Sequence, residues 1–385
     1  MQQRLPLMIS ATFFFTYTMS LSVLRQFLMR DAGAPIFLIS LTSTVNGGTA
    51  ILMATIWGIL SDRLGKRKFF LVLSCIMIGI IGIMYVYASS PLDFVLITVA
   101  FSMFSSAFRP VSMALSSEYA TSNSSKTREL SFLNLSNSLG MFIGRVILGF
   151  TLLMLSPYKV VFVFIPVAFL ALIPVLRVRE AGYVKMAERL HESGERLLHF
   201  LKRNGLWTMY LSAFLRQTGI SGIMSLSAIY ITENIGLSKS TMGFLSAVNP
   251  LVQMPSHLFF ARVIGRIGAK KTAAAGMALS ALTAVLFLGA RSAKGIAAGY
   301  MAIGFAFGAF INGSASFVVQ NSPETRKGQF LGMLSSSRSL GSTFGPALAG
   351  VLASFSYSLM FAVMAFLMLT GCVLTLIFCK DADSS

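Results

Sequence analysis

Long stretches without a single charged residue constrain this sequence more than any other feature. Phe69–Ala88 and Leu359–Phe378 contain no Asp, Glu, Lys or Arg. A run of about 20 apolar residues is long enough to cross the hydrocarbon core of a bilayer as a helix. Backbone groups in hydrocarbon must bond within helices or closed barrels, and the period-two alternation of barrel strands is absent from the sequence. The sequence therefore predicts an all-α polytopic membrane protein.

The composition supports the same class. Hydrophobic residues make up 55% of the chain and charged residues 11%, whereas soluble domains carry about 25% charged residues. The net charge of +18 would suit a nucleic-acid binder. However, the basic residues form short clusters between apolar runs, which is typical of membrane topology signals. We therefore expect the lipid bilayer as partner and no nucleic acid.

Polar and Gly/Pro punctuation divides the chain into twelve predicted spans. In the first half they cover 5–28, 36–60, 68–88, 92–116, 130–154 and 160–177. In the second half they cover 207–231, 241–263, 271–290, 295–319, 329–353 and 359–379. We accordingly divide the chain into a six-helix bundle at 1–177, a linker at 178–206, a second six-helix bundle at 207–380 and a short tail at 381–385.

The positions of Lys and Arg predict the orientation. One set of loops and ends holds most of them, including Arg63–Lys68 and Arg266–Lys271, and the other set holds only Arg30, Lys159, Lys239, Arg291 and Lys294. Because cytoplasmic loops are enriched in Lys and Arg, we expect both termini and the linker in the cytoplasm of a plasma-membrane protein. Apolar residues at helical spacing in the linker predict an amphipathic helix at the membrane surface.

The two halves of the sequence repeat each other. Ser43–Asn46 recurs as Ser246–Asn249, and Arg63–Lys68 recurs as Arg266–Lys271, both at an offset of 203. Glycines 140, 144 and 149 recur as glycines 341, 345 and 350 at an offset of 201. Repeated halves predict two pseudo-symmetric six-helix bundles with a binding site near the bilayer midplane, exposed to each side in turn.

The loop after the second span carries a recognisable motif. Gly58–Lys68 reads GILSDRLGKRK and resembles the G-x-L-x-D-R-x-G-R-[K/R]-[K/R] signature of the major facilitator superfamily. The resemblance covers the whole chain and implies that family's fold and transport by alternating access. It also implies a cytoplasmic gate that contains Gly58, Asp62, Arg63, Gly65 and Arg67, with Glu118 as charge partner. Gly58 would let helices approach closely. The alternative is that the basic cluster only sets topology.

A second pattern lies in the eleventh span. Gly341–Gly350 resembles the GxxxGPxxGG pattern that many antiporters of this family carry in the fifth span. The fifth span of this chain has Arg145 where that pattern has proline. Small residues at these spacings also let two helices pack closely, which is the interpretation we prefer.

Arginines inside the spans provide the candidate substrate site. Arg145, Arg216 and Arg338 fall near mid-span and Arg109 in the inner half, while no Asp or Glu lies in the centre of any span. Arg25 and Arg262 lie closer to span ends, where they can reach the interface. An anionic substrate could pair with a buried guanidinium. We therefore predict an organic or inorganic anion as substrate, with these binding residues: Arg109, Arg216, Arg145, Arg338, Gln217 and Asn312. The alternative is that some arginines are structural.

The sequence leaves the driving force open. His257 is the one mid-span group that titrates near neutral pH, so we take it as the candidate proton site. Uniport or exchange with a counter-substrate fits equally well. We find no phosphate-binding loop, no metal-ligand spacing and no catalytic arrangement. We therefore expect no cofactor, no metal and no enzyme activity, and we expect a monomer.

Two other functions remain as alternatives. Multidrug or metabolite efflux by the same superfamily is the first, although a pump for cationic drugs would hold an acidic residue in its cavity. A sensor or receptor that does not transport is the second. A sensor would need a soluble signalling domain, and the tail after Lys380 is too short for one.

Overall fold

A computed structural model describes residues 4–119, 123–180, 205–323 and 326–380, with the side chains of 123–128 left out. The part of the chain described is almost entirely helical and contains no strand. The predicted amphipathic linker helix falls largely on residues 181–204 and lies outside the described residues.

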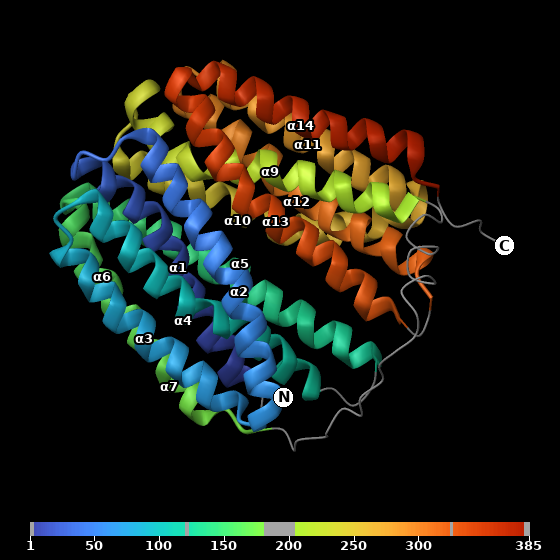
Figure 1. The fold of residues 1–385 in the computed structure, drawn as a ribbon, viewed down its shortest axis with the longest axis horizontal. Coiled ribbons are helices and arrows are strands. Elements are labelled where there is room, and N and C mark those ends of the chain that lie inside the picture. Colours follow the sequence, from blue (N-terminus) through green and yellow to red (C-terminus); the bar gives the residue numbers. More distant parts are fainter. Residues whose placement is uncertain (1–3, 120–122, 181–204, 324–325, 381–385) are drawn as a thin grey trace. The chain divides into compact units, whose positions relative to one another are not determined.

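The helices of the first half follow the predicted spans closely. They are α1 (Leu5–Asp31), α2 (Ile36–Leu64), α3 (Arg67–Tyr87), α4 (Pro91–Glu118), α5 (Asn123–Met154), α6 (Pro157–Leu170) and α7 (Leu172–Arg177). The sixth span is thus divided at Ala171 into α6 and α7. Figure 1 shows α3 beside α6 and α7, and the three helices pack together.

The second half provides six further long helices and one short π-helix. They are α9 (Leu206–Ile229), η2 (Tyr230–Asn234), α10 (Lys239–Ile267), α11 (Ala269–Gly289), α12 (Ala293–Asn321), α13 (Lys327–Phe355) and α14 (Tyr357–Phe378). With α6 and α7 counted as one span, twelve spans are present in the described part, as predicted.

The chain divides into two compact units. The first comprises Met1–Lys185 with Ile231–Pro250, and the second comprises Met186–Tyr230 with Leu251–Ser385. Helix α10 therefore begins in the first unit and ends in the second.

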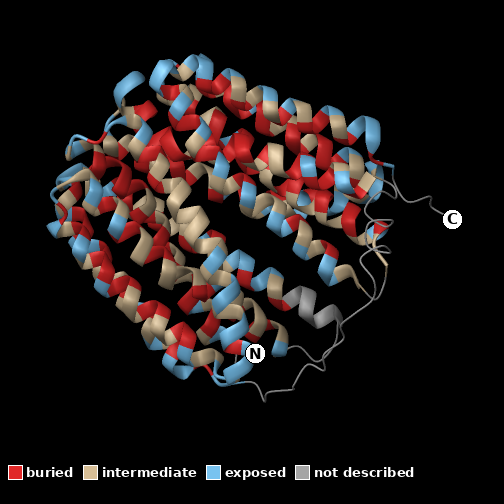
Figure 2. Cartoon of the chain, in the orientation of Figure 1, coloured by how far each residue is buried: buried red, intermediate tan, exposed pale blue. Residues whose placement is uncertain are grey.

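The hydropathy of the helices fits a bilayer. Within the described residues, nine spans are long and apolar enough to cross a membrane. Three helices of similar length are more polar, namely α9, α10 and α13. Many large apolar side chains are exposed, among them Leu52, Leu258 and Phe366, and Figure 2 shows exposed positions along the outer helices. Such a surface is stable only in contact with lipid.

The repeated glycines bring helices together in both units. A Cβ atom on Gly140 would lie 2.3 Å from the carbonyl oxygen of Thr12, so α5 contacts the backbone of α1. A Cβ atom on Gly341 would lie 2.6 Å from the carbonyl oxygen of Phe214, so α13 contacts α9 in the same way. The close-packing interpretation of these glycines is therefore confirmed.

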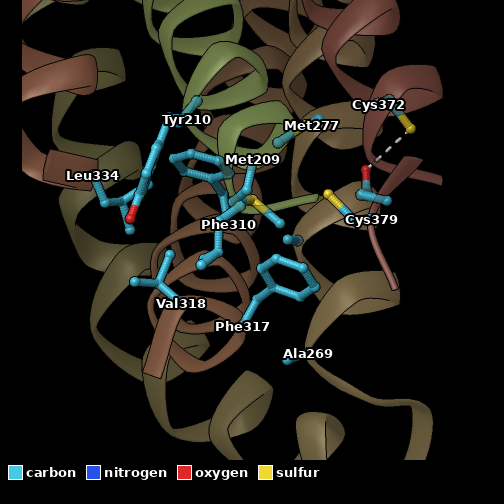
Figure 3. Packing of buried hydrophobic residues seen from close by; sticks show 14 of the residues in the cluster. Met209, Tyr210, Ala269, Met277, Phe310, Phe317, Val318, Leu334, Cys372 and Cys379 are labelled. Atoms are coloured by element: carbon cyan, nitrogen blue, oxygen red, sulfur yellow. Dashed lines mark hydrogen bonds between the residues drawn. The ribbon is translucent and has the colours of Figure 1, made fainter. Parts of the chain in front are cut away.

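The second unit has an apolar core where α9, α11, α12, α13 and α14 meet. Met209, Phe310 and Phe317 are fully buried in it, together with Leu334 and Met277. Figure 3 shows these side chains packed against one another, with the thiol of Cys372 donating a hydrogen bond to the carbonyl oxygen of Ala274. This core fixes the helices that carry the arginines of the second unit.

Candidate functional site

Arg109 lies in α4 of the first unit. Its side chain is exposed, and it makes no hydrogen bond or ion pair within the described residues. Ser105 and Ser102 lie one and two turns before it on the same face of the helix, whereas the exposed apolar residues Leu92 and Leu96 lie on another face. The guanidinium of Arg109 is therefore available to a ligand on a polar side of α4.

Arg216 in α9 behaves differently because it is fully buried, with 0% of its surface exposed. Its Nε donates to the hydroxyl of Ser280 at 2.9 Å, and its Nη1 donates to Oε1 of Gln217 at 3.1 Å. The guanidinium also lies 4.7 Å from the ring centroid of Phe310, within cation–π range. Its Nη2 has no hydrogen-bond partner in the described part of the chain.

Gln217 connects this arginine to α13. Its Nε2 donates to the hydroxyl of Ser342 at 3.0 Å. Arg338 lies one helical turn before Ser342, on the same face of α13. Its positive charge is close enough to act on Arg216. Gln217 and Arg338 are only partly buried, as are His257 and Asn312, whereas Arg216 is fully buried.

His257 and Asn312 complete the cluster of the second unit. The side-chain amide of Asn312 donates to the backbone carbonyl of His257 at 2.8 Å. The imidazole meets the ring of Phe307 edge to face, with centroids 5.8 Å apart. The same ring lies 5.9 Å from the guanidinium of Arg216. Five predicted residues are therefore brought together here: Arg216, Gln217, Asn312, Arg338 and His257.

Arg145 and Arg25 are two further arginines within the spans of the first unit. Nη2 of Arg145 lies 3.5 Å from the hydroxyl of Ser22. The expectation that Arg25 reaches the interface is wrong, because its side chain is only 6% exposed. Its terminal nitrogens bond the hydroxyls of Thr98 and Ser43 at 3.3 and 3.2 Å. These hydroxyls, on α4 and α2, hold Arg25 inside the unit.

The predicted gate residues form an ionic network around Arg67. Its Nη1 lies 2.8 Å from Asp62, and its Nε lies 2.5 Å from Glu118. Arg63 is exposed and has no partner in the described part of the chain. The structure thus brings Asp62, Arg67 and Glu118 together, and Arg63 lies outside the network.

The two glycines of the motif have different roles. The expectation that Gly58 lets helices approach closely is wrong in this structure, because a Cβ atom there would meet nothing within 4 Å. Gly65 ends α2 with φ 63°, and Gly268 lies before α11 with φ 86°, at the repeat offset of 203. Such values favour glycine.

Glu180 extends this network. Its carboxylate accepts from the backbone N–H groups of Arg67 at 3.2 Å and Lys68 at 2.7 Å, at the start of α3. A carboxylate is favourable at a helix N-terminus. The hydroxyl of nearby Tyr119 donates to the carbonyl of Arg179 at 2.6 Å. Burial, with the charges of Glu180 and Glu118, raises the pKa of Tyr119 to about 12, so this hydroxyl keeps its proton.

The carboxylates of the described residues lie at helix ends, except for buried Glu129 in the second turn of α5, and each has a partner. Asp31 pairs with Lys239, Asp62 and Glu118 pair with Arg67, Glu129 pairs with Arg4, and Glu233 pairs with Arg30. Asp93 accepts from the backbone of Ser89 and Ser90, and Glu180 caps α3. None of them is a partner of Arg25, Arg109 or Arg216. The described residues also contain no group of three His, Cys, Asp or Glu side chains suited to a metal.

Sequence reasoning missed several residues of these clusters. Ser280, Phe307 and Ser342 contact predicted residues from other helices, and a single serine or phenylalanine in an apolar span carries no distinctive signal. Glu180 follows the last helix of the first half, so its position at the start of α3 appears only in three dimensions. Arg25 could have been recognised from the sequence as a residue with buried partners, because an arginine in a span always needs a partner.

Comparison with known proteins identifies the scaffold. The family model of the Major Facilitator Superfamily matches residues 7–226 and again 209–385. The uncharacterized MFS-type transporter YuxJ of Bacillus subtilis is 26% identical over 343 residues, covering 84% of this chain and 83% of that protein. The quinolone resistance protein NorA of Staphylococcus aureus is 22% identical over 180 residues, 47% of this chain and 46% of NorA.

Solved structures show the same fold at low identity. A mutant form of the nucleoside transporter NupG superposes with a TM-score of 0.84 at 13% identity, covering 98% of this chain and 100% of NupG. The human organic anion transporter MFSD10 gives a TM-score of 0.67 at 17% identity, covering 97% of this chain and 98% of that one. These likenesses show the fold.

Proposed function

Since this chain belongs to the major facilitator superfamily and is a transporter of that type, we propose that it carries a small organic or inorganic anion across the membrane by alternating access. One observation carries the proposal. Arg109 presents an exposed guanidinium in a membrane helix, without a hydrogen bond or ion pair among the described residues. A guanidinium keeps its charge at any physiological pH, and a carboxylate or phosphate is its natural ligand.

The second unit supports the same substrate class. Arg338 and Gln217 are partly exposed polar groups of its cluster, and fully buried Arg216 adds a further positive charge to it. In this proposal Arg109 is the substrate contact of the first unit, and Arg338 and Gln217 are the candidate contacts of the second unit. Arg216 is a positioning residue, because its Nη1 holds the amide oxygen of Gln217. Asn312 holds the backbone of His257 in place, and His257 is the proposed proton site.

The proposal includes a gate and an orientation. The network of Arg67 with Asp62 and Glu118 would close the cytoplasmic side, and both termini would lie in the cytoplasm of a plasma-membrane protein. All three native cysteines are buried, so an introduced cysteine can be labelled selectively. An impermeant maleimide outside whole cells should leave Arg63→Cys unlabelled and should label it after permeabilisation. Ready labelling in intact cells would reject this orientation.

Uptake into proteoliposomes tests the substrate class. We expect labelled phosphate, sulfate, succinate or AMP to enter vesicles that contain the protein, and a labelled organic cation to stay outside. Arg109→Gln should weaken the apparent affinity for the transported anion at least about tenfold, the usual effect of losing a charge-assisted bond. Arg262→Gln, an exposed arginine near the end of α10, is the matched control and should behave like wild type.

Efflux of drugs or metabolites is the second candidate, and the likeness to NorA over 180 residues favours it. The same vesicles decide between the two. Accumulation of a quinolone in inside-out vesicles, with every small anion excluded, would support efflux and contradict anion transport.

A further inference from the structure

The empty transporter keeps a positive charge that it cannot release. The guanidinium of Arg109 is exposed and stays protonated at physiological pH. Within the described residues no carboxylate, hydroxyl or amide pairs with it. Without a bound anion, water is therefore the main group that solvates this charge.

Alternating access removes that water. Between its two open states, a carrier passes through an occluded state in which the binding groups lose contact with bulk solvent. A charge that leaves water without a partner carries a large desolvation penalty, and a bound anion offsets this penalty. The loaded protein should therefore cross the occluded state far more readily than the empty one.

Among the described residues, no free carboxylate can exchange a proton in place of the anion. The carboxylates there are already paired or capped, including buried Glu129, which pairs with Arg4. His257 is the titratable group of the cluster in the second unit, and its protonation would add a further positive charge to those of the arginines. Binding of a proton at His257 therefore increases the charge that the empty protein must carry through occlusion.

The second unit adds a charge that is equally fixed. Arg216 is held by Ser280, Gln217 and the ring of Phe310. It has no carboxylate partner in the described part of the chain, and it is fully buried. Its positive field strengthens the binding of an anion by the cluster. The loaded and the empty protein therefore differ more in the free energy that they need to reach the occluded state.

From these charges we infer that the protein is an anion exchanger, which returns across the membrane only when a second anion replaces the first. The inference rests on the proposed anion transport and specifies its mode. It depends on the charge of Arg109. It does not use the glycine–proline pattern of antiporters, in which α5 has Arg145 in place of the proline.

Efflux from preloaded proteoliposomes tests the mode. Vesicles are loaded with labelled phosphate, sulfate or succinate, and potassium with valinomycin clamps the membrane potential. Efflux is then followed into the same anion, into chloride, or into the bulky buffer anion Mes. We expect efflux at least tenfold faster into the same anion than into Mes. Fast efflux into chloride would also support exchange and would identify chloride as a counter-substrate.

The contrary outcomes are distinct. Equal efflux into all three media overturns the exchange inference and leaves anion transport intact. If no labelled anion crosses the membrane in any medium, anion transport itself is rejected, and exchange with it.

Variants of Arg109 test whether its charge is the reason that the empty protein does not return across the membrane. If its charge blocks the empty protein, Arg109→Gln should bring the ratio of exchange to net efflux close to one, and Arg109→Lys should keep the ratio near wild type. Arg262→Gln is again the control and should leave the ratio unchanged. If Arg109→Gln does not transport, the ratio of exchange to net efflux measured for the wild-type protein still tests the inference. A functional Arg109→Gln protein that retains a tenfold ratio would overturn this explanation.

Discussion

Phe14 in the first unit and Arg216 in the second occupy equivalent places in the repeat. Gly140 and Gly144 contact the carbonyls of Thr12 and Thr16, while Gly341 and Gly345 contact those of Phe214 and Thr218. The contacted residues of α1 and α9 are thus 202 positions apart in both cases. By that offset Phe14 corresponds to Arg216, and Phe108 corresponds to Phe310.

The partner ring is the same in both units, but the group that covers it differs. The ring of Phe14 stacks on that of Phe108, with centroids 3.9 Å apart. In the second unit the guanidinium of Arg216 lies over Phe310 at 4.7 Å. In the first unit, the flat apolar ring of Phe14 fills the space over the ring of Phe108. The charge of Arg216 is therefore not required by the fold, which favours a functional role for it.

The largest expected effect comes from moving the charge into the first unit. Phe14→Arg would bury a guanidinium without a carboxylate partner, which destabilises by about 3–5 kcal/mol. Phe14→Leu should cost less than about 1.5 kcal/mol, as a hydrophobic exchange of similar size. A thiol-reactive dye that reports exposure of the buried cysteines on heating measures both variants. Equal stability of Phe14→Arg and wild type would show that this site tolerates charge.

The reverse exchange separates function from stability. Arg216→Met should change the free energy of unfolding by less than about 1 kcal/mol, since an apolar residue of similar volume can replace a buried charge. Anion uptake should nevertheless fall about tenfold, because Gln217 loses its partner and the site loses a charge. Normal uptake together with a large loss of stability would mean that Arg216 is structural.

The glycine contacts test whether the two scaffolds are equivalent. Gly140→Ala and Gly341→Ala should each cost about 1–3 kcal/mol by overpacking, and by similar amounts in the two units. Gly58→Ala is the control, since a methyl group there meets nothing within 4 Å, and it should stay within about 0.5 kcal/mol of wild type. The same melting assay applies. A large effect in only one of the two units would break the equivalence.

The smallest effect is expected where charges are exposed. Arg30 and Glu233 form a two-contact ion pair at 2.6 and 2.9 Å, with more than a third of each side chain exposed. Glu233→Gln should cost about 0–1 kcal/mol, and added salt should reduce the difference from wild type. A cost that salt does not change would show that this pair is shielded from solvent.

Most of the fold could be predicted from the sequence, because each span carries its own signal. Apolar runs of about 20 residues located the helices, and glycine spacing indicated close packing of the fifth and eleventh spans without showing which helices they contact. The break at Ala171 was missed although Pro174 signals it, because a proline cannot donate to the carbonyl four residues back, which here belongs to Leu170. The prediction for Gly58 failed because a glycine in a motif does not reveal what faces it.

The site was predictable only in part. Arginines in spans stand out, and five predicted residues cluster in the second unit. Their exposure could not be predicted: Arg109 is open and Arg216 is fully buried, although both lie in helices of similar appearance. Depth along one helix says nothing about which neighbours cover a side chain. For the same reason Arg25 was expected at the interface and lies inside the unit.

Ligand-dependent melting tests the central claim most directly, namely that arginines in the membrane bind an anion. Purified protein and Arg109→Gln are heated with anionic, neutral or cationic metabolites at constant ionic strength. A bound ligand at a hundred times its Kd stabilises by about 2.7 kcal/mol. We predict that at least one anion raises the melting temperature of wild type and raises that of Arg109→Gln less. Stabilisation by cations alone, or equal stabilisation of both proteins by every anion, would contradict the account.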